Sequence, residues 1–261
     1  MKKILAMSTF CVDVYPALGT AYAGGNALNI AVSCAKTKKA EVFLMGCIGR
    51  DIYGRQICEI ADKYLLNRAH LYMIVGETAS NKVFLTEGGD RYFKPDSWTD
   101  GVVRKFAISP EDSALIRDVD AVATTLNDNL ILQIAEQKPK LLSVDFMEHT
   151  PTDDWLEFLP VIDLFFISGK PDYFPLLKKW SREYSAVFVA TLGENGSVAF
   201  NNGEEFHCDA VEVAEVVDTI GCGDSYQGAF IVEYLESGDI LSAMKAGAES
   251  AAVTLSFMGA V

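Results

Sequence analysis

The sequence predicts an α/β protein in which a doubly wound, mostly parallel sheet carries helices on both faces. Two observations support this prediction. Apolar, β-rich segments alternate with helix-length segments along most of the 261 residues. Half of the residues are hydrophobic and 11% are aromatic, which is enough to build one large buried core. We therefore expect a single domain that spans residues 1–261.

The N-terminal part of the chain already shows this alternation. Residues 3–14 are apolar and β-rich. Gly24-Gly25 then opens a helical pattern that extends over residues 24–38. A strand is expected over 42–48 and a helix over 51–64. This succession has the spacing of parallel βαβ units.

The pattern then changes to short strands without helices between them. These strands are expected at 70–75, 79–87 and 91–93, and Gly88-Gly89-Asp90 is a hairpin signal. We expect antiparallel structure inserted into the α/β domain. The insertion would form a small β lid around residues 76–106.

Alternation resumes at Ser109-Pro110-Glu111-Asp112, which is typical of a helix start with proline in the first position. Further strands are expected at 120–124, 140–146, 164–168 and 186–192. A second hairpin is expected around Asn201-Asn202-Gly203, and two helices at about 222–237 and 239–257 close the chain.

Composition excludes several classes of partner. The chain has 22 basic and 36 acidic residues, so its net charge of −14 repels nucleic acid and anionic membranes. The apolar run near the N-terminus is interrupted by Ser8 and Thr9, too early for a signal peptide. No segment has the roughly 18 apolar residues of a membrane helix. The six cysteines form no C-x-x-C pair, which argues against a zinc site. We expect a cytoplasmic protein.

The strongest functional signal is Asp218-Thr219-Ile220-Gly221-Cys222-Gly223-Asp224. Backbone N–H groups of Gly221, Cys222 and Gly223, at the start of a helix, can bind an anion without any basic side chain. Asp224 follows directly and can accept a hydroxyl proton. A bare G-x-G-D is often only a turn, but the longer string favours a site.

Two further strings have functional potential, although each alone is also typical of a loop. In Gly24-Gly25-Asn26-Ala27-Leu28-Asn29, the last side chain can donate to and accept from hydroxyls. Asp13 is expected at the carboxyl end of the first strand, where open α/β sheets bind ligands. Thr191-Leu192-Gly193-Glu194-Asn195-Gly196 passes from a strand into a hairpin.

Taken together and in this order, with Gly46, Gly49 and Gly54 between them, these strings resemble the ribokinase-like carbohydrate kinases, the PfkB family. The resemblance covers essentially the whole chain. It implies a ribokinase-like fold with a β lid. It also implies an ATP-dependent enzyme that phosphorylates an alcohol group of a sugar.

The resemblance also implies roles for individual residues. Asp224 would be the general base, and Gly221, Cys222 and Gly223 would form the anion hole for the transferred phosphoryl group. Cys222 replaces the alanine usual in the family but would contribute only its N–H. The residues implied to contact ATP are Thr191, Gly193, Gly196, Asp218 and Thr219, with the adenine near 247–253. The residues implied to contact the acceptor are Asp13, Gly25, Asn29, Asp145 and Arg91.

Cofactors and partners follow from the same resemblance. The family uses ATP with Mg²⁺, and a monovalent cation such as K⁺ is implied near Asp218 and Thr219. The family's N-x-x-E motif has no match, because residues 168–172 read S-G-K-P-D. The metal ligands are therefore unknown, and Asp172 or the nucleotide phosphates would replace the motif. A homodimer through the lid is expected.

Several segments narrow the resemblance within the family. Residues 11–16, 106–112, 143–146 and 257–261 resemble kinases that phosphorylate fructoselysine and related fructosamines at the 6-hydroxyl. Fructokinase, ribokinase and nucleoside kinase activities remain alternatives, as does a non-catalytic sugar- or nucleotide-binding regulator. A dinucleotide-dependent oxidoreductase is disfavoured, because no G-x-G-x-x-G follows the first strand.

Overall fold

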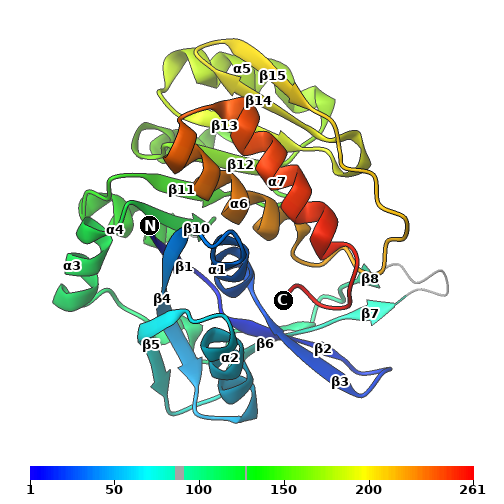
Figure 1. Ribbon diagram of the computed structural model, residues 1–261. Coiled ribbons are helices and arrows are strands. Elements are labelled where there is room, and N and C mark those ends of the chain that lie inside the picture. The colour runs from blue at the N-terminus through cyan, green and yellow to red at the C-terminus, as the bar shows by residue number, and fades with distance from the viewer. Residues whose placement is uncertain (86–90, 127) are drawn as a thin grey trace.

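The computed structural model describes residues 1–85, 91–126 and 128–261 (Figure 1). The strands are β1 (Lys2–Met7), β2 (Cys11–Tyr15), β3 (Thr20–Gly24), β4 (Ala40–Gly49), β5 (Asn67–Ile74), β6 (Ala79–Lys82), β7 (Phe84–Leu85), β8 (Arg91–Tyr92), β9 (Trp98–Thr99), β10 (Ala121–Thr125), β11 (Leu142–Asp145), β12 (Leu164–Ser168), β13 (Val187–Thr191), β14 (Ser197–Asn201) and β15 (Glu204–Cys208). The α-helices are α1 (Asn26–Lys36), α2 (Ile52–Lys63), α3 (Pro110–Asp118), α4 (Asp128–Glu136), α5 (Phe174–Glu183), α6 (Cys222–Ser237) and α7 (Ile240–Thr254).

A nine-stranded sheet forms the centre of the molecule, in the order β15-β14-β13-β12-β11-β10-β1-β4-β5. The strands from β13 to β5 run parallel to their neighbours, whereas β14 and β15 are antiparallel. The fold class predicted from the sequence is therefore confirmed. The N-terminal ends of α1 and α6 both lie near the carboxyl edge of this sheet, where such sheets bind ligands.

Helices cover both faces of the sheet, and each face has its own core (Figure 1). Alternate side chains of β1 belong to the two different cores. Ile4 and Ala6 pack toward α1, α2, α6 and α7. Leu5 and Met7 pack toward α3, α4 and α5. All four side chains are essentially fully buried, as expected for a central parallel strand.

Local signals in the sequence place several element ends correctly. Ser109 caps α3, accepting from the backbone N–H of Asp112, whose carboxylate in turn accepts from the N–H of Ser109. The hairpin between β14 and β15 turns at Asn202 and Gly203, both with positive φ, which is the conformation that an Asn-Gly pair favours.

The lid is a separate four-stranded sheet in the order β3-β2-β6-β9. Two of its strands come from residues 11–24, so the lid is not built from the 76–106 segment alone. The expectation of one strand over residues 3–14 is wrong. The chain leaves the main sheet after Met7. The hydroxyl of Ser8 hydrogen-bonds that of Thr125, and the ring of Phe10 packs against Gly46.

Two further expectations for the 70–93 region need correction. Residues 67–74 do not belong to the insertion: β5 pairs in parallel with β4 at the edge of the main sheet. The lid is not wholly antiparallel either, since β2 and β6 run in parallel. Gly88-Gly89-Asp90 and the end of the strand expected over 79–87 lie outside the described residues. The flanking strands β7 and β8 pair antiparallel.

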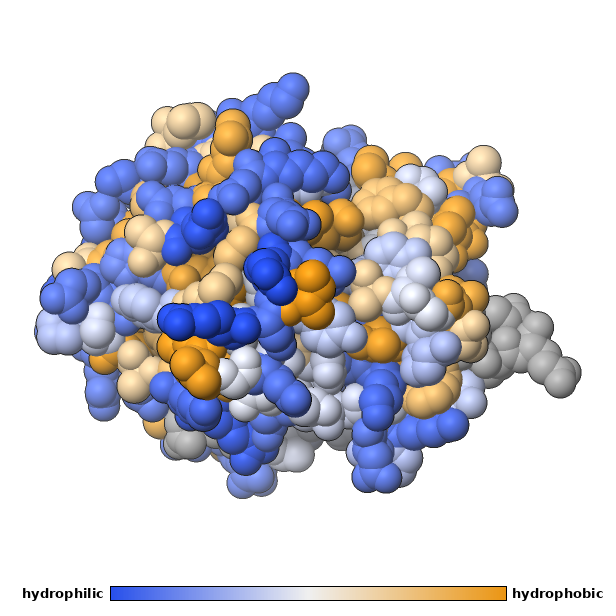
Figure 2. All heavy atoms as spheres, turned by 90° about the horizontal axis from the view of Figure 1, so that it is seen from below, coloured by the Kyte–Doolittle hydropathy of each residue, from blue (hydrophilic) through white to orange (hydrophobic). Residues whose placement is uncertain are grey.

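One face of the molecule shows how polar and apolar residues are distributed on the surface. Figure 2 shows the lower face of Figure 1, where hydrophilic residues predominate and apolar ones are dispersed among them. Within the described ranges, none of the helices has the length and apolar character needed to span a bilayer. No disulfide joins the six cysteines, all of which lie in the described part.

Candidate active site

Asp224 lies in the first turn of α6, at the carboxyl edge of the sheet, and is only 7% exposed. Its two carboxylate oxygens accept hydrogen bonds from the side-chain amides of Asn26 and Asn29, each at 2.8 Å. These asparagines occupy the first turn of α1. The Gly-Gly-Asn string and the Gly-Cys-Gly-Asp string, almost 200 positions apart in the chain, therefore form one site.

The environment of Asp224 suits a carboxylate that accepts a proton. Burial raises the pKa of its carboxyl group, and the two asparagine amides act in the opposite direction by stabilising the charge. The net effect is a pKa above the ordinary value. A base with a raised pKa takes a hydroxyl proton more readily than an exposed aspartate does.

A second polar atom points to a ligand beside Asp224. Oδ1 of Asn29 is buried and has no hydrogen-bond partner among the residues that the structure describes. A Cβ placed on Gly24 would lie 3.6 Å from this atom and 3.2 Å from Oδ2 of Asp13. Asp13, Asn29 and Asp224 therefore converge. Asp13 reaches the site from the lid strand β2 and not, as expected, from the end of the first main-sheet strand.

Asp145 is a second buried carboxyl group at this edge, at the end of β11 and 8% exposed. Its Oδ1 accepts a hydrogen bond of 2.8 Å from the backbone N–H of Met147. Burial, reinforced by the negative charge of Asp224, raises the pKa of Asp145 to about 7. The charge of Asp224 is therefore close enough to Asp145 to disfavour ionisation of the latter.

The loop before α6 has the shape expected of an anion pocket. Gly221 adopts a left-handed conformation with φ of 74° at the N-cap, and no side chain of the described part caps this helix. A Cβ on Gly223 would meet no described atom within 4 Å, so that position is open. The N–H of Cys222 donates to the carbonyl of Thr219 at 3.4 Å. Backbone N–H groups here can bind a phosphate.

Asp218 holds this loop in place. Its oxygens accept from the backbone N–H groups of Ile220 and Gly259, each at 2.9 Å. The hydroxyl of Tyr15, on the lid strand β2, donates to the same carboxylate at 3.5 Å. Asp218 therefore joins the anion loop, the C-terminal segment and the lid, a role that the sequence did not indicate.

The hairpin expected to contact ATP lies at the same edge of the sheet. Gly193 has φ of 60°, and a Cβ there would meet no atom of the described residues within 4 Å, so it is accessible. Gly196, with φ of 78°, packs directly against the carbonyl of Cys208, which leaves no room for a side chain. The side chain of Thr191 contacts the carbonyl of Ile167 at 3.4 Å. Gly193 is thus the residue of this group best placed to approach a ligand.

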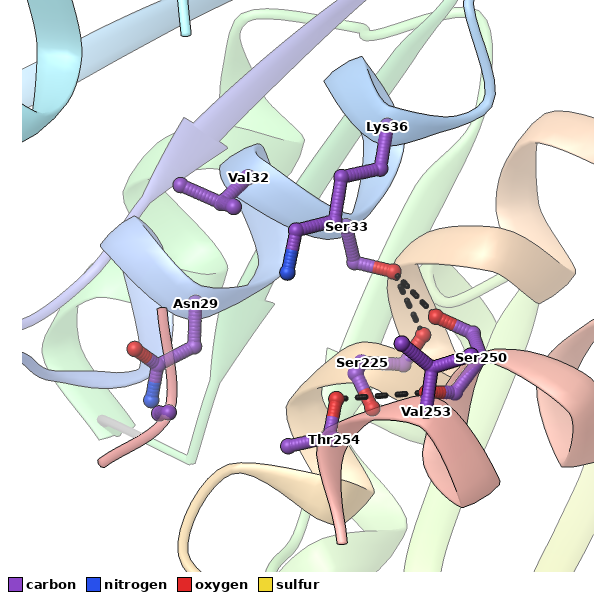
Figure 3. Close-up of a pocket in the computed structure, with 9 residues that line it drawn as sticks. Asn29, Val32, Ser33, Lys36, Ser225, Ser250, Val253 and Thr254 are labelled. Carbon is purple, nitrogen blue, oxygen red and sulfur yellow. Dashed lines mark hydrogen bonds between the residues drawn. The ribbon is translucent and has the colours of Figure 1, made fainter. Parts of the chain in front are cut away.

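Several implied contacts serve packing in the structure. A Cβ on Gly25, with φ of 90°, would lie 2.5 Å from the carbonyl oxygen of Thr9. Gly247 packs against the ring of Tyr226, and Ser250 hydrogen-bonds Ser33 across α1 and α7 (Figure 3). These residues of the expected adenine segment hold α7 against its neighbours. Arg91 lies in β8, and its side chain is outside what the structure describes.

Sequence reasoning missed Asn26 as a partner of Asp224. It lies three positions before Asn29, so both side chains project from the same side of the first helical turn. The three-residue spacing of the two asparagines could have indicated that both side chains reach the same group.

The site offers few protein ligands for a metal ion. Within the described residues, no three His, Cys, Asp or Glu side chains gather in a group that could hold one. Asp172, the expected substitute for the missing motif, is exposed in a short 3₁₀ turn (Pro171–Tyr173) after β12. A magnesium ion would therefore be bound mainly by nucleotide phosphates and water.

Comparisons with known proteins agree with this geometry. Residues 11–261 match the model of the pfkB family of carbohydrate kinases. Fructoselysine 6-kinase from Escherichia coli is 31% identical over the full length of both chains. A fructosamine kinase from Bacillus subtilis is 29% identical over 99% of this chain and 92% of the relative.

Solved structures show the same fold. Arabidopsis thaliana ribokinase complexed with ribose and ATP superposes with a TM-score of 0.84 at 21% identity, covering 99% of this chain and 93% of the ribokinase. A nucleoside kinase from Methanocaldococcus jannaschii gives 0.82 at 19% identity, covering 100% and 93%. The chain belongs to the PfkB family of carbohydrate kinases, and it is a phosphotransferase that acts on a sugar hydroxyl.

Proposed function

We propose that this enzyme transfers the γ-phosphoryl group of ATP to the 6-hydroxyl of fructoselysine or a related fructosamine, with Asp224 as the general base. The observation that carries the catalytic part is the buried Asp224 carboxylate, fixed by two asparagine amides beside an uncapped helix N-terminus. The acceptor rests on the similarity over full length to kinases that are named for fructoselysine and fructosamine.

Each group has a distinct task in this proposal. Asp224 takes the proton from the acceptor hydroxyl as its oxygen attacks phosphorus. The unpaired Oδ1 of Asn29 accepts a hydrogen bond from an acceptor hydroxyl and so orients the sugar. The backbone N–H groups of residues 221–223, together with the helix dipole, stabilise the negative charge on the transferred group.

Kinases of this family use ATP, typically with Mg²⁺. The open position at Gly223 and the accessible Gly193 fit a triphosphate along the edge of the sheet. Magnesium would supply charge neutralisation of the phosphates. A monovalent cation near Asp218 and Thr219 would share carboxylate oxygens that already accept two backbone N–H groups.

The lid is also proposed to form a homodimer interface. Trp98 in lid strand β9 is more than 40% exposed, as are Tyr92 in the neighbouring short strand β8 and Phe93 just after it. Exposed aromatic side chains of this kind often mark association surfaces. Light scattering of the purified protein should give twice the chain mass, and a monomer at micromolar concentration would contradict the dimer.

The acceptor is tested by measuring ADP formation with fructoselysine, fructose, ribose and adenosine at equal concentrations. We expect the highest kcat/KM with fructoselysine and a 6-phosphate product by NMR. Turnover of only the plain sugars or of the nucleoside would overturn the fructosamine assignment. Binding without turnover of any acceptor would instead favour a regulator.

A further inference from the structure

A cavity of about 360 Å³ lies beside the candidate active site. Its walls combine polar and apolar side chains: among the apolar ones, Met7 ends β1, Met45 lies within β4 and Leu130 comes from α4. Phe106, in the segment between the lid and α3, also lines it. Its volume is that of a typical small-molecule site, yet none of the acceptor residues inferred from the sequence lines it.

The cavity adjoins the site through residues 8 and 9. The carbonyl oxygen of Thr9 accepts from the backbone N–H of Ala27 at 3.3 Å and packs against Gly25, while Thr9 also lines the cavity. Ser8 lines it too, and its hydroxyl makes a short hydrogen bond with that of Thr125. Thr125 lies opposite Asp145 in the sheet register. Ser8 and Thr9 therefore lie between the cavity and the proposed acceptor site.

The rim of the cavity carries an ion pair. Arg104 lines the rim, and its Nε lies 2.7 Å from Oδ2 of Asp100. The indole N–H of Trp98, on lid strand β9, donates to the other oxygen of Asp100 at 2.6 Å. The guanidinium is largely exposed, so its remaining N–H donors can reach a ligand.

This arrangement complements one kind of molecule. The apolar side chains of the cavity can pack against a short aliphatic chain, and the guanidinium of Arg104 can bind a carboxylate through paired hydrogen bonds. The adjacent Asp100 attracts an ammonium group. A chain that ends in an α-amino acid has both charges, whereas a plain sugar would leave the cavity unused. Phosphate groups are less suited, because Arg104 is the only basic residue among those that line the cavity in the described part.

We propose that this cavity binds the amine substituent of the acceptor, with an aliphatic chain along Met7 and Phe106 and a terminal carboxylate at Arg104. The inference rests on the proposed function, since it assigns a subsite to the fructosamine acceptor. Arg104 is then a specificity-determining residue. It acts on which acceptor binds and not on the phosphoryl transfer itself.

Two acceptors with the same sugar separate these roles. Fructoselysine ends in an α-amino acid, and N-butyl fructosamine ends in a methyl group. In Arg104→Gln, kcat/KM for fructoselysine should fall about tenfold through KM, because a charge-assisted contact is lost. The value for N-butyl fructosamine should change less than twofold. In Ala107→Trp, which fills the cavity, kcat/KM for both should fall at least tenfold, with an unchanged Tm.

Lys105→Gln is the matched control. It removes one positive charge at the neighbouring position, where the side chain contacts the carbonyl of Val75 and does not line the cavity. Lys105→Gln should leave kcat/KM unchanged for both acceptors. An equal loss for both acceptors in Arg104→Gln, or no loss in Ala107→Trp, would overturn the subsite while leaving the proposed function standing. A wild-type enzyme that phosphorylates neither fructosamine would overturn the proposed function, and the subsite with it.

Discussion

The side-chain amide of Asn29 donates a hydrogen bond of 2.8 Å to Oδ2 of Asp224, which joins the first turn of α1 to the first turn of α6. Asn26 makes the equivalent bond to Oδ1. Because both donors stabilise the charged carboxylate, they hold the pKa of Asp224 below the value that burial alone would produce. Burial raises the pKa of the proposed base, and residues of another helix limit that rise.

Asn26→Ala should therefore shift the pH dependence of the reaction. Loss of one donor raises the pKa of Asp224, so the acidic limb of the kcat/KM profile should move to higher pH by about one unit. Steady-state rates between pH 5 and 9 measure this shift. Asn67→Ala, on the exposed edge strand β5, is the control and should leave the limb in place. An unmoved limb in Asn26→Ala would show that Asp224 does not limit the rate at acidic pH.

Asp145→Asn should change how stability depends on pH. The folded-state pKa of Asp145 is about 7, above the ordinary aspartate value near 3.8, so folding takes up a proton between these values. The wild-type free energy of unfolding then falls as pH rises from 4 to 7. The asparagine variant lacks this loss. The free energy of unfolding of Asp145→Asn should equal the wild-type value at pH 4 and exceed it by at most about 4 kcal/mol at pH 8.

Urea denaturation of both proteins at pH 4, 6 and 8 measures this difference. A constant difference across the range would mean that Asp145 is ionised in the folded state throughout. The matched control is Asp153→Asn, which removes a carboxylate from an exposed position in the 3₁₀ turn Asp153–Glu157.

Gly221 and Gly223 should respond differently to alanine. Gly221→Ala forces a side chain into a left-handed conformation and against Ala260, so it should lower stability by about 1–3 kcal/mol. Gly223→Ala meets no described atom within 4 Å and should fold normally. Its methyl group would instead occupy the proposed phosphate position. We expect kcat/KM for ATP to fall about 100-fold with an unchanged Tm, and full activity in Gly223→Ala would contradict the anion pocket.

Sequence reasoning predicted the fold class and several of the glycine-rich strings that lie at the carboxyl edge of the sheet, because glycine placement and strand–helix alternation are local signals. The Gly221–Asp224 string predicted a helix start beside an anion pocket, and α6 begins at Cys222. The lid was only partly predicted. Residues 3–14 form one apolar, β-rich segment in the sequence, and nothing local shows that the chain crosses to another sheet after Met7.

Contacts between segments that are far apart in the chain could not be predicted from sequence patterns either. Tyr15 and Gly259, which both donate to Asp218, lie near opposite ends of the chain. Pairings of this kind depend on how the termini pack in three dimensions. The cavity near Arg104 was missed for the same reason, because its lining comes from β1, β4, α4 and the segment after the lid.

Asp218→Ala should loosen the anion loop. It removes the acceptor for the N–H groups of Ile220 and Gly259, so both are left without their partner. We expect KM for ATP to rise about tenfold and hydrogen exchange to accelerate in residues 219–223 and 257–261. Faster exchange confined to one of these two segments would show that Asp218 does not couple them.

The central claim, that Asp224 is the base for phosphoryl transfer to the fructosamine 6-hydroxyl, is tested most directly with Asp224→Asn. The asparagine side chain keeps the shape of the site but cannot take a proton. With saturating ATP and fructoselysine, kcat should fall about 1,000-fold or more, while the Kd for fructoselysine changes little. A kcat within tenfold of the wild-type value, in a variant that folds and binds both substrates, would contradict the assignment.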